Sequence, residues 1–260
     1  MTEKKHVLIV ASPRPRVGKT LLARLLADHL SLAGEPRRLF DTDAADARLT
    51  EFFPGGTTVV DIERVPDQMK LFDSLVVEPI SSQIIDLTHR SFGKFFGLMR
   101  DIGYVAEAKA AGLETVIFYI PDSEPDSYEQ GLALRDRFRE CGFVLVKNAA
   151  IGEPSRETLR NGSFLALTGH RPNMLLRQLD PFFVSAIEDI RLSLSDFMQR
   201  SMHRPGSAAM SPDQMSLAYL SLEARNGITV WLQATFNEVR RALRDTDLQA
   251  DILAHDRFGA

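Results

Sequence analysis

The chain has 260 residues, of which 44% are hydrophobic and 25% are charged, the balance of a globular protein that can bury a sizeable core. Lysine and arginine number 31 against 35 aspartates and glutamates, so the formal net charge is −4 and gives no global argument for binding nucleic acid. The lone Cys141 excludes an internal disulfide. No apolar run approaches the ~20 residues of a membrane span, so we expect a cytoplasmic protein without a transmembrane segment.

Residues 6–30 predict a buried strand, a tight loop and a helix. The apolar run VLIV is typical of a strand buried on both faces, and leucines spaced four apart after Thr20 predict an amphipathic helix. Between them, residues 17–20 (VGKT) form the second half of the phosphate-binding loop G-x-x-x-x-G-K-S/T. Gly18 would let backbone N–H groups approach a phosphate, Lys19 would add a point charge, and the Thr20 hydroxyl could ligate Mg²⁺.

The first half of this loop departs from the pattern. Pro13 stands where the first glycine belongs, and Arg14, Pro15 and Arg16 follow. Each proline lacks an N–H, so two possible donors are lost, while the donors nearest the helix remain. The alternative is that Gly-Lys-Thr is a chance tripeptide opening an ordinary helix, but its place between a strand and a helix favours nucleotide binding. The expected nucleotide-binding residues of the loop are Arg16, Val17, Gly18, Lys19, Thr20 and Leu21.

Strands and helices alternate along the next part of the chain, which predicts an α/β fold with a mostly parallel sheet. We expect strands at 38–41, 57–60, 83–86, 115–120, 143–146 and 164–167, and helices at 44–53, 67–75, 92–102 and 126–139. From about residue 172 the pattern becomes helical. One helix opens at Asp180-Pro181, residues 201–210 form a loop, a helix opens at the capping box 211–214 and ends at Asn226-Gly227, and a last helix follows. We therefore expect a nucleotide-binding domain over 1–172 and a helical extension over 173–260 packed on it.

Carboxylates follow several predicted strands. Asp41, Asp43 and Asp86 each lie at or just past the carboxyl end of a strand, where ligands of open α/β sheets bind. A nucleoside triphosphate with Mg²⁺ needs a hydroxyl ligand, a carboxylate that holds the metal's waters and a group that orients the attacking water. Thr20, Asp86 and Asp43 could fill those roles and form the expected metal site. The alternative for each aspartate alone is a strand-end or helix-cap residue.

The order of these motifs resembles the ParA/MinD family of P-loop ATPases, within a wider group that includes dethiobiotin and cobyrinate synthetases. The family's deviant loop reads G-K-G-G-x-G-K-T, and residues 13–20 occupy the same eight positions. The family's signature lysine, which reaches phosphates across a nucleotide-sandwiched dimer, falls on Arg14. Residues 41–43 match its switch I Asp-x-Asp, Asp86 ends a strand like the one leading into switch II, and Asn148 matches the adenine-contacting asparagine.

This resemblance, over about residues 6–170, implies a three-layer αβα P-loop NTPase that binds ATP and ADP with Mg²⁺. It implies catalytic roles for Lys19, Asp43 and Arg14, and a homodimer that closes on ATP to position a cargo. Two alternatives stay open: an ATP-dependent synthetase, and a non-hydrolysing relative in which the proline-substituted loop leaves only an interaction module. Arginines on the C-terminal helices could bind DNA, but scattered arginines are more often a solvated face, so DNA is not favoured. The acidic residues 245–260 argue against a membrane helix.

Overall fold

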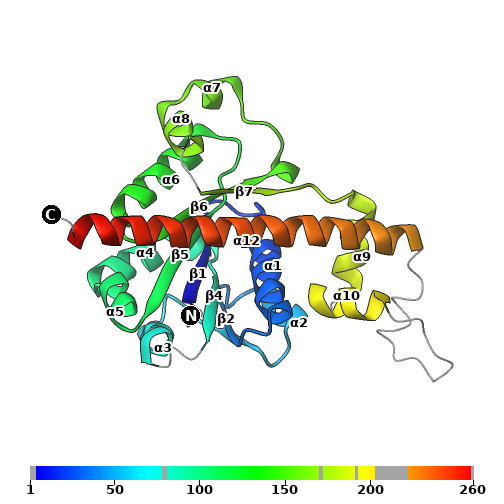
Figure 1. Cartoon of the computed structure of the whole chain (residues 1–260), viewed down its shortest axis with the longest axis horizontal. Helices are drawn as coiled ribbons and strands as arrows, with labels where there is room; N and C mark the ends of the chain where they lie inside the picture. The colour runs from blue at the N-terminus through cyan, green and yellow to red at the C-terminus, as the bar shows by residue number, and fades with distance from the viewer. Residues whose placement is uncertain (1–3, 78–80, 170–171, 191–192, 203–221, 259–260) are drawn as a thin grey trace.

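The computed structural model describes residues 4–77, 81–169, 172–190, 193–202 and 222–258. Seven strands form one sheet in the order β3-β2-β4-β1-β5-β6-β7, and every neighbouring pair is parallel (Figure 1). The strands are β1 (Lys5–Ala11), β2 (Arg37–Asp41), β3 (Thr57–Val59), β4 (Ser82–Asp86), β5 (Leu113–Tyr119), β6 (Gly142–Asn148) and β7 (Asn173–Leu176). This arrangement confirms the predicted α/β class with a parallel sheet.

The sheet is covered by helices on both faces, which makes three layers. Alternate residues of β1 divide between two hydrophobic cores, with Leu8 and Val10 in one and Val7 and Ile9 in the other. The first core receives side chains from α1 (Lys19–Leu32), α2 (Leu49–Phe52), α9 (Pro181–Ile190), α10 (Leu194–Met202) and α12 (Leu222–Phe258). The second receives them from α3 (Val65–Val77), α4 (Phe92–Asp101), α5 (Tyr104–Ala110), α6 (Pro125–Arg137) and α8 (Gly162–Thr168). The other helices among the described residues are α7 (Arg156–Arg160) and the 3₁₀ turns η1 (His89–Ser91) and η2 (Ala149–Ile151).

The longest helix, α12, extends along the whole molecule in the view of Figure 1. Its apolar side chains include Ile228, Leu232 and Val239, which are fully buried in the first core. The sequence predicts that a helix ends at Asn226-Gly227, but this prediction is wrong, because α12 continues through both residues. A Cβ added at Gly227 would lie 2.8 Å from the Phe183 ring, so the glycine permits close helix packing. The predicted helix start at 211–214 lies outside the described residues.

Two other predicted elements differ from the structure. Residues 164–167 do not form a strand: they belong to α8, whose first turn is capped by Asn161 accepting from the backbone N–H groups of Ser163 and Phe164. The last strand is instead β7, which lies beyond residue 172 in the part expected to be wholly helical. The helix expected over 44–53 is limited to α2, because the chain before it forms turns around the Asp41 carboxylate. Among the described residues, no helix is both long and apolar enough to cross a bilayer.

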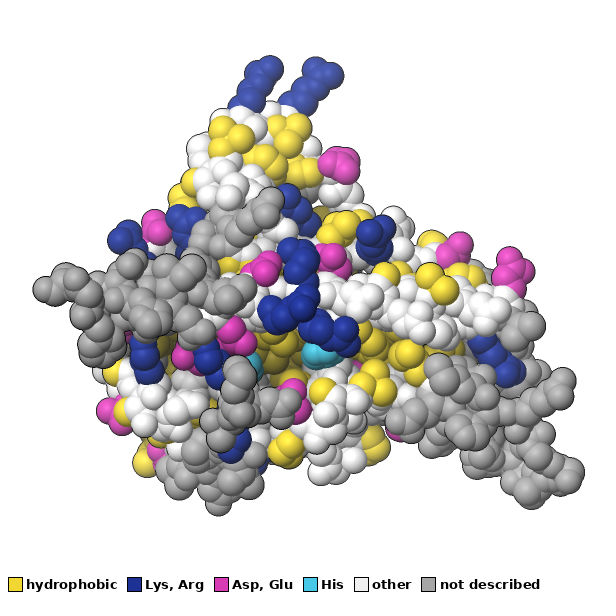
Figure 2. Space-filling model, viewed as in Figure 1, with side chains coloured by type: hydrophobic (Ala, Val, Ile, Leu, Met, Phe, Trp, Pro, Cys, Tyr) yellow, Lys and Arg dark blue, Asp and Glu magenta, His cyan; other side chains and the backbone are white. Residues whose placement is uncertain are grey.

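Lysine and arginine side chains gather over the middle of α12 in the face shown by Figure 2. Arg240 and Arg244 are exposed there, but acidic residues lie among them. Arg241 pairs with Glu238 at 2.7 Å and with Asp245 at 3.5 Å. The surface of this helix is therefore of mixed charge, and DNA binding stays an unfavoured prediction.

Candidate functional site

The loop between β1 and α1 contains two residues in the left-handed conformation near its helix end. Gly18 precedes α1 with a φ of 94°, and Arg16 has a φ of 57°, a left-handed conformation that is uncommon outside glycine. Residues in such conformations are often held by their surroundings at functional sites. Backbone N–H groups that follow a left-handed residue converge, and at a helix N-terminus they form a concave seat for an anion.

Asn148, at the end of β6, supports this loop from behind. Its Nδ2 donates to the carbonyl of Val17 at 2.9 Å, and its Oδ1 accepts from the backbone N–H of Ala150 at 3.0 Å. A Cβ added at Gly18 would lie 2.7 Å from Asn148 Nδ2, so only glycine fits beside this amide. The resemblance implies that Asn148 contacts adenine, but the structure does not place it among the residues that line the pocket. In the structure its side chain braces the loop, and its contact with adenine stays a prediction.

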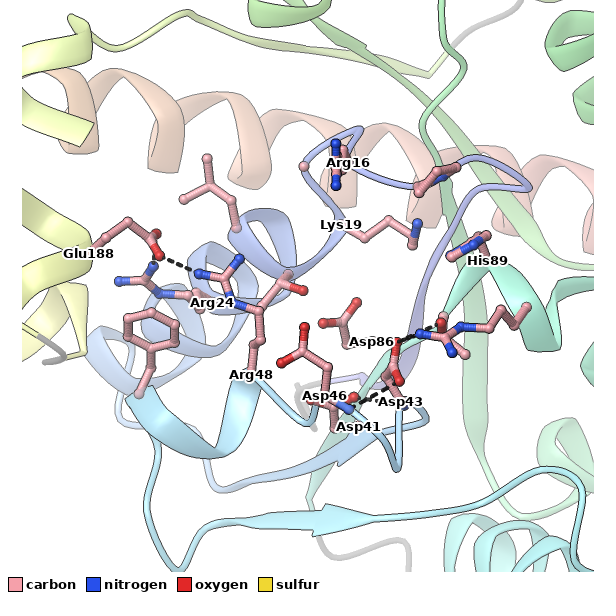
Figure 3. A pocket seen from close by; sticks show the side chains of 17 residues that line it. Arg16, Lys19, Arg24, Asp41, Asp43, Asp46, Arg48, Asp86, His89 and Glu188 are labelled. Atoms are coloured by element: carbon pink, nitrogen blue, oxygen red, sulfur yellow. Dashed lines mark hydrogen bonds and ion pairs between the residues drawn. The ribbon is translucent and has the colours of Figure 1, made fainter. Parts of the chain in front are cut away.

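A cavity of about 590 Å³ opens in front of the loop (Figure 3). Of the predicted site residues, it brings together Arg16, Gly18, Lys19, Thr20, Leu21, Asp43 and Asp86; Val17 is buried behind them, and Arg14 and Asn148 lie outside. Its other lining residues are Pro15, Arg24, Asp41, Asp46, Arg48, Phe52, Thr88, His89, Arg90 and Glu188. Most of the lining side chains are therefore charged or polar, and Pro15 forms part of the wall without closing the pocket.

Lys19 is buried at the N-terminus of α1, with 9% of its surface exposed. Its Nζ donates to the carbonyl of Arg14 at 2.6 Å, which holds the ammonium group across the loop. Burial lowers the pKa of Lys19, and the nearby negative charges of Asp86 and Asp43 oppose that shift. A polyphosphate bound in the loop would supply the negative charge that a buried ammonium group needs.

The carboxyl ends of β2 and β4 deliver the acidic residues, beside the carboxyl end of β1. The register pairs Asp41 of β2 with Asp86 of β4, and Asp86 with Val10 of β1, so the acids meet at the edge where the loop begins. Burial raises the pKa of Asp86 to about 7, reinforced by the charges of Asp41 and Asp43 and opposed by a hydrogen bond from Thr20. Burial also raises the pKa of Asp41 to about 6.

These aspartates have different surroundings. Asp41 accepts hydrogen bonds from the backbone N–H groups of Asp43, at 2.9 Å, and Leu49, at 3.0 Å, so it shapes the turn that follows β2. Asp43 is more accessible. It accepts from the Thr88 hydroxyl at 2.9 Å and pairs with Arg90 at 3.4 Å.

The oxygen atoms of Thr20, Asp43 and Asp86 face the same pocket and are the donor type that Mg²⁺ prefers. Among the described residues, no group of three His, Cys, Asp or Glu side chains is arranged to hold a metal by itself. This fits a magnesium ion that takes one or two protein oxygens and completes its shell with phosphate oxygens and water. The donor set thus fits the predicted metal when a nucleotide accompanies it.

Arg14, predicted to reach phosphates, points elsewhere. Its guanidinium pairs at 3.1 Å with Asp122, which follows β5, and at 2.6 Å with Asp126, in the first turn of α6. In this arrangement its charge is neutralised within its own chain. Arg16 instead lines the pocket, and it is exposed.

The sequence did not predict the residues at the α9 end of the pocket. Arg24, on α1, is 1% exposed and lies flat against the Phe52 ring, with its Cζ 3.3 Å from the ring centroid. Its Nη1 donates to Glu188 at 2.9 Å, and Arg48 donates to the other oxygen of Glu188 at 2.8 Å. An arginine within a leucine-rich helix face was the one available signal; nothing in the sequence indicated that Glu188 of α9 would meet it.

No protein-family model matches the chain, and no curated protein matches it. Among solved structures, it is similar to a nucleotide-binding protein in complex with ADP from Archaeoglobus fulgidus, at 14% identity and a TM-score of 0.46, over 72% of this chain and 87% of that one. It is also similar to Aquifex aeolicus MinD in a MinC:MinD cell division complex, at 11% identity and a TM-score of 0.45, over 86% and 95% of the two chains. A second Aquifex aeolicus MinD structure matches at 13% identity and a TM-score of 0.42, over 86% and 96%. Because all three TM-scores are below 0.5, function must be inferred from the pocket itself.

Proposed function

We propose that the protein is a P-loop ATPase that binds ATP with Mg²⁺ in the pocket at the start of α1. The observation that carries the proposal is the shared pocket of Lys19, Thr20, Asp43 and Asp86, which places a cation, a helix N-terminus and two carboxylates around one cavity. Magnesium would neutralise phosphate charge there. Lys19 would bind the phosphates, Thr20 and Asp86 would hold the ion, and Asp43 would orient the attacking water.

The accessible position of Asp43 supports its assignment. Its side chain is 23% exposed and accepts from Thr88, Arg90 and the backbone N–H of Asp46, whereas Asp41 is only 3% exposed. A carboxylate that reaches the solvent of the pocket can take a proton from a water or orient it, so the more exposed Asp43 suits the role better than Asp41. This supports hydrolysis over the non-hydrolysing alternative.

Calorimetric titration with Mg²⁺ and a slowly hydrolysed ATP analogue tests the binding site. Lys19→Ala should weaken binding by about 100-fold or more, because it removes a charge-assisted contact from a buried seat. Lys94→Ala is the matched control, since Lys94 lies on α4 and pairs with Glu63 at 2.7 Å away from the pocket. Equal affinity in wild type and Lys19→Ala would reject the assignment.

Phosphate release tests turnover. Asp43→Ala should leave binding within a few-fold of wild type and lower the rate of hydrolysis by about 100-fold or more, the range for a general base. Full activity in this variant would remove Asp43 from the mechanism.

The proposal extends to a homodimer that forms on ATP and acts as a switch on a cargo. For Arg14 to reach a second subunit, it would have to leave Asp122 and Asp126, to which it is paired in the single chain. Sizing the protein with and without the ATP analogue tests this step. Wild type should double in mass with nucleotide and Arg14→Ala should not; a protein that stays monomeric when saturated would reject the dimer while leaving the binding site intact.

A further inference from the structure

We propose that Arg48 is a phosphate-contacting residue of the pocket and that Glu188, from the C-terminal helix α9, competes with the phosphate for it. The inference rests on the proposed nucleotide binding. It assigns Glu188, on a C-terminal helix, a role in setting the affinity of that site. In the single chain, Arg48 is held by Glu188; when a polyphosphate binds, Arg48 exchanges this carboxylate for a phosphate oxygen.

The first step is the charge balance at the α9 end of the pocket. Arg24 and Arg48 both donate to the one carboxylate of Glu188, as Figure 3 shows. The two guanidinium groups are close enough that the charge of Arg48 lowers the pKa of Arg24, after the larger effect of burial. Asp28 also offsets the charge of the buried Arg24, whereas Arg48 meets Glu188 at the exposed edge, so an arriving anion would compete with Glu188 for Arg48.

The second step is the difference between the two arginines. Arg24 is 1% exposed, packs on the Phe52 ring and forms an ion pair with Glu188. Moving Arg24 would separate a buried charge from its ion-pair partner, which is costly. The Arg48 side chain is 51% exposed and meets Glu188 at an exposed edge, where ion pairs contribute little and exchange readily. Arg48 is therefore the member of the cluster that can turn toward a ligand.

The third step is the position of Arg48 in the chain. It follows Asp43 and Asp46 in the segment between β2 and α2, and it lines the same cavity as Lys19 and Thr20. Arg14, the residue expected to bring an extra cation to the phosphates, is paired with Asp122 and Asp126 outside this cavity. A guanidinium suits phosphate because its N–H groups can make two parallel hydrogen bonds.

Affinity for the Mg²⁺-bound ATP analogue tests the exchange, because the two partners have opposite expected effects. Arg48→Gln should weaken binding by about tenfold, the effect of losing a hydrogen bond to a charged group. Glu188→Gln should tighten it by about threefold, because it removes a competitor as weak as a surface ion pair. Glu63→Gln, in the exposed pair with Lys94, is the matched control and should change nothing.

The double variant separates the exchange from a general change in charge. If Glu188 acts through Arg48, then Arg48→Gln/Glu188→Gln should bind like Arg48→Gln alone. Persistent tightening by Glu188→Gln in the Arg48→Gln background would overturn the competition, as would weaker binding in Glu188→Gln. Wild-type binding with no loss in Arg48→Gln would reject this inference alone, whereas no binding by the wild type would reject the proposed function.

A measurement on the wild-type protein covers the case in which Glu188→Gln fails to fold. The side-chain Nε resonance of Arg48, assigned by its loss in Arg48→Gln, should shift when the Mg²⁺-bound analogue is added. The corresponding resonance of Arg100, which pairs with its neighbour Asp101 on α4, serves as the internal control. An Arg48 resonance that stays in place at saturating nucleotide would overturn the proposal.

Discussion

Asp86→Asn should change how the stability of the nucleotide-free protein depends on pH. Burial raises the pKa of Asp86 to about 7 from an ordinary value of 3.8, and only 5% of the residue is exposed. Between those two pH values the folded state binds a proton that the unfolded state has lost. The free energy of unfolding contributed by this carboxyl therefore falls as pH rises toward 7 and is constant above it.

The size of the effect follows from linkage. Each pH unit over which the folded carboxyl is protonated and the unfolded one is ionised is worth about 1.4 kcal/mol. Between about pH 5 and pH 8 this condition holds over close to two pH units, so the contribution of the carboxyl to the free energy of unfolding falls by about 3 kcal/mol. Asparagine keeps the shape and can still accept from Thr20, but it carries no charge at any pH. Relative to wild type, Asp86→Asn should therefore gain about 3 kcal/mol across this range.

Urea unfolding at a series of pH values, with a chelator present, measures this difference. Asp73→Asn, on the exposed side of α3, is the control for changing an aspartate charge and should show no comparable gain. The reasoning would be refuted if the difference between Asp86→Asn and wild type stayed flat over the range or decreased. Saturating Mg²⁺ and ATP analogue should reduce the gain, because a bound cation favours the ionised carboxylate that asparagine lacks.

Two further predictions concern packing and reactivity away from the pocket. Gly131→Ala should lower the free energy of urea unfolding by about 1–3 kcal/mol, because its Cβ would lie 2.5 Å from Tyr119 and 2.9 Å from Leu167. Gly97→Ala in α4 is the matched change without a neighbour within 4 Å, and it should stabilise by about 0.5–1 kcal/mol; equal effects would contradict the packing argument. Cys141 should react slowly with a disulfide reagent at neutral pH and rapidly after denaturation, because burial raises the pKa of its thiol to about 12. Rapid labelling of the folded protein would show that the thiol is more accessible than its burial indicates.

Much of the fold could be predicted because its signals are local. The apolar run that predicts β1 and the leucine periodicity that predicts α1 depend on neighbours within a few residues, and the structure confirms both elements. The strands that end at Asp41 and Asp86 were likewise predicted, and the parallel order brings these acids together at one edge. The strand prediction for residues 164–167 was wrong because a short apolar run fits a strand or a helix equally well. The Asn161 side chain caps this segment as the helix α8.

By itself the amino-acid sequence determined the α/β class, the strand–loop–helix unit of β1 and α1 and the strand-end aspartates, because each of these depends on residues that lie close together in the chain. Tertiary structure alone decided that Arg14 pairs with Asp122 and Asp126, and that Glu188 meets Arg24 from α9. Both contacts join residues more than a hundred positions apart, and a charged side chain can pair with any opposite charge that the fold brings within reach. Which charges line the pocket and which are neutralised elsewhere is therefore decided by the packing.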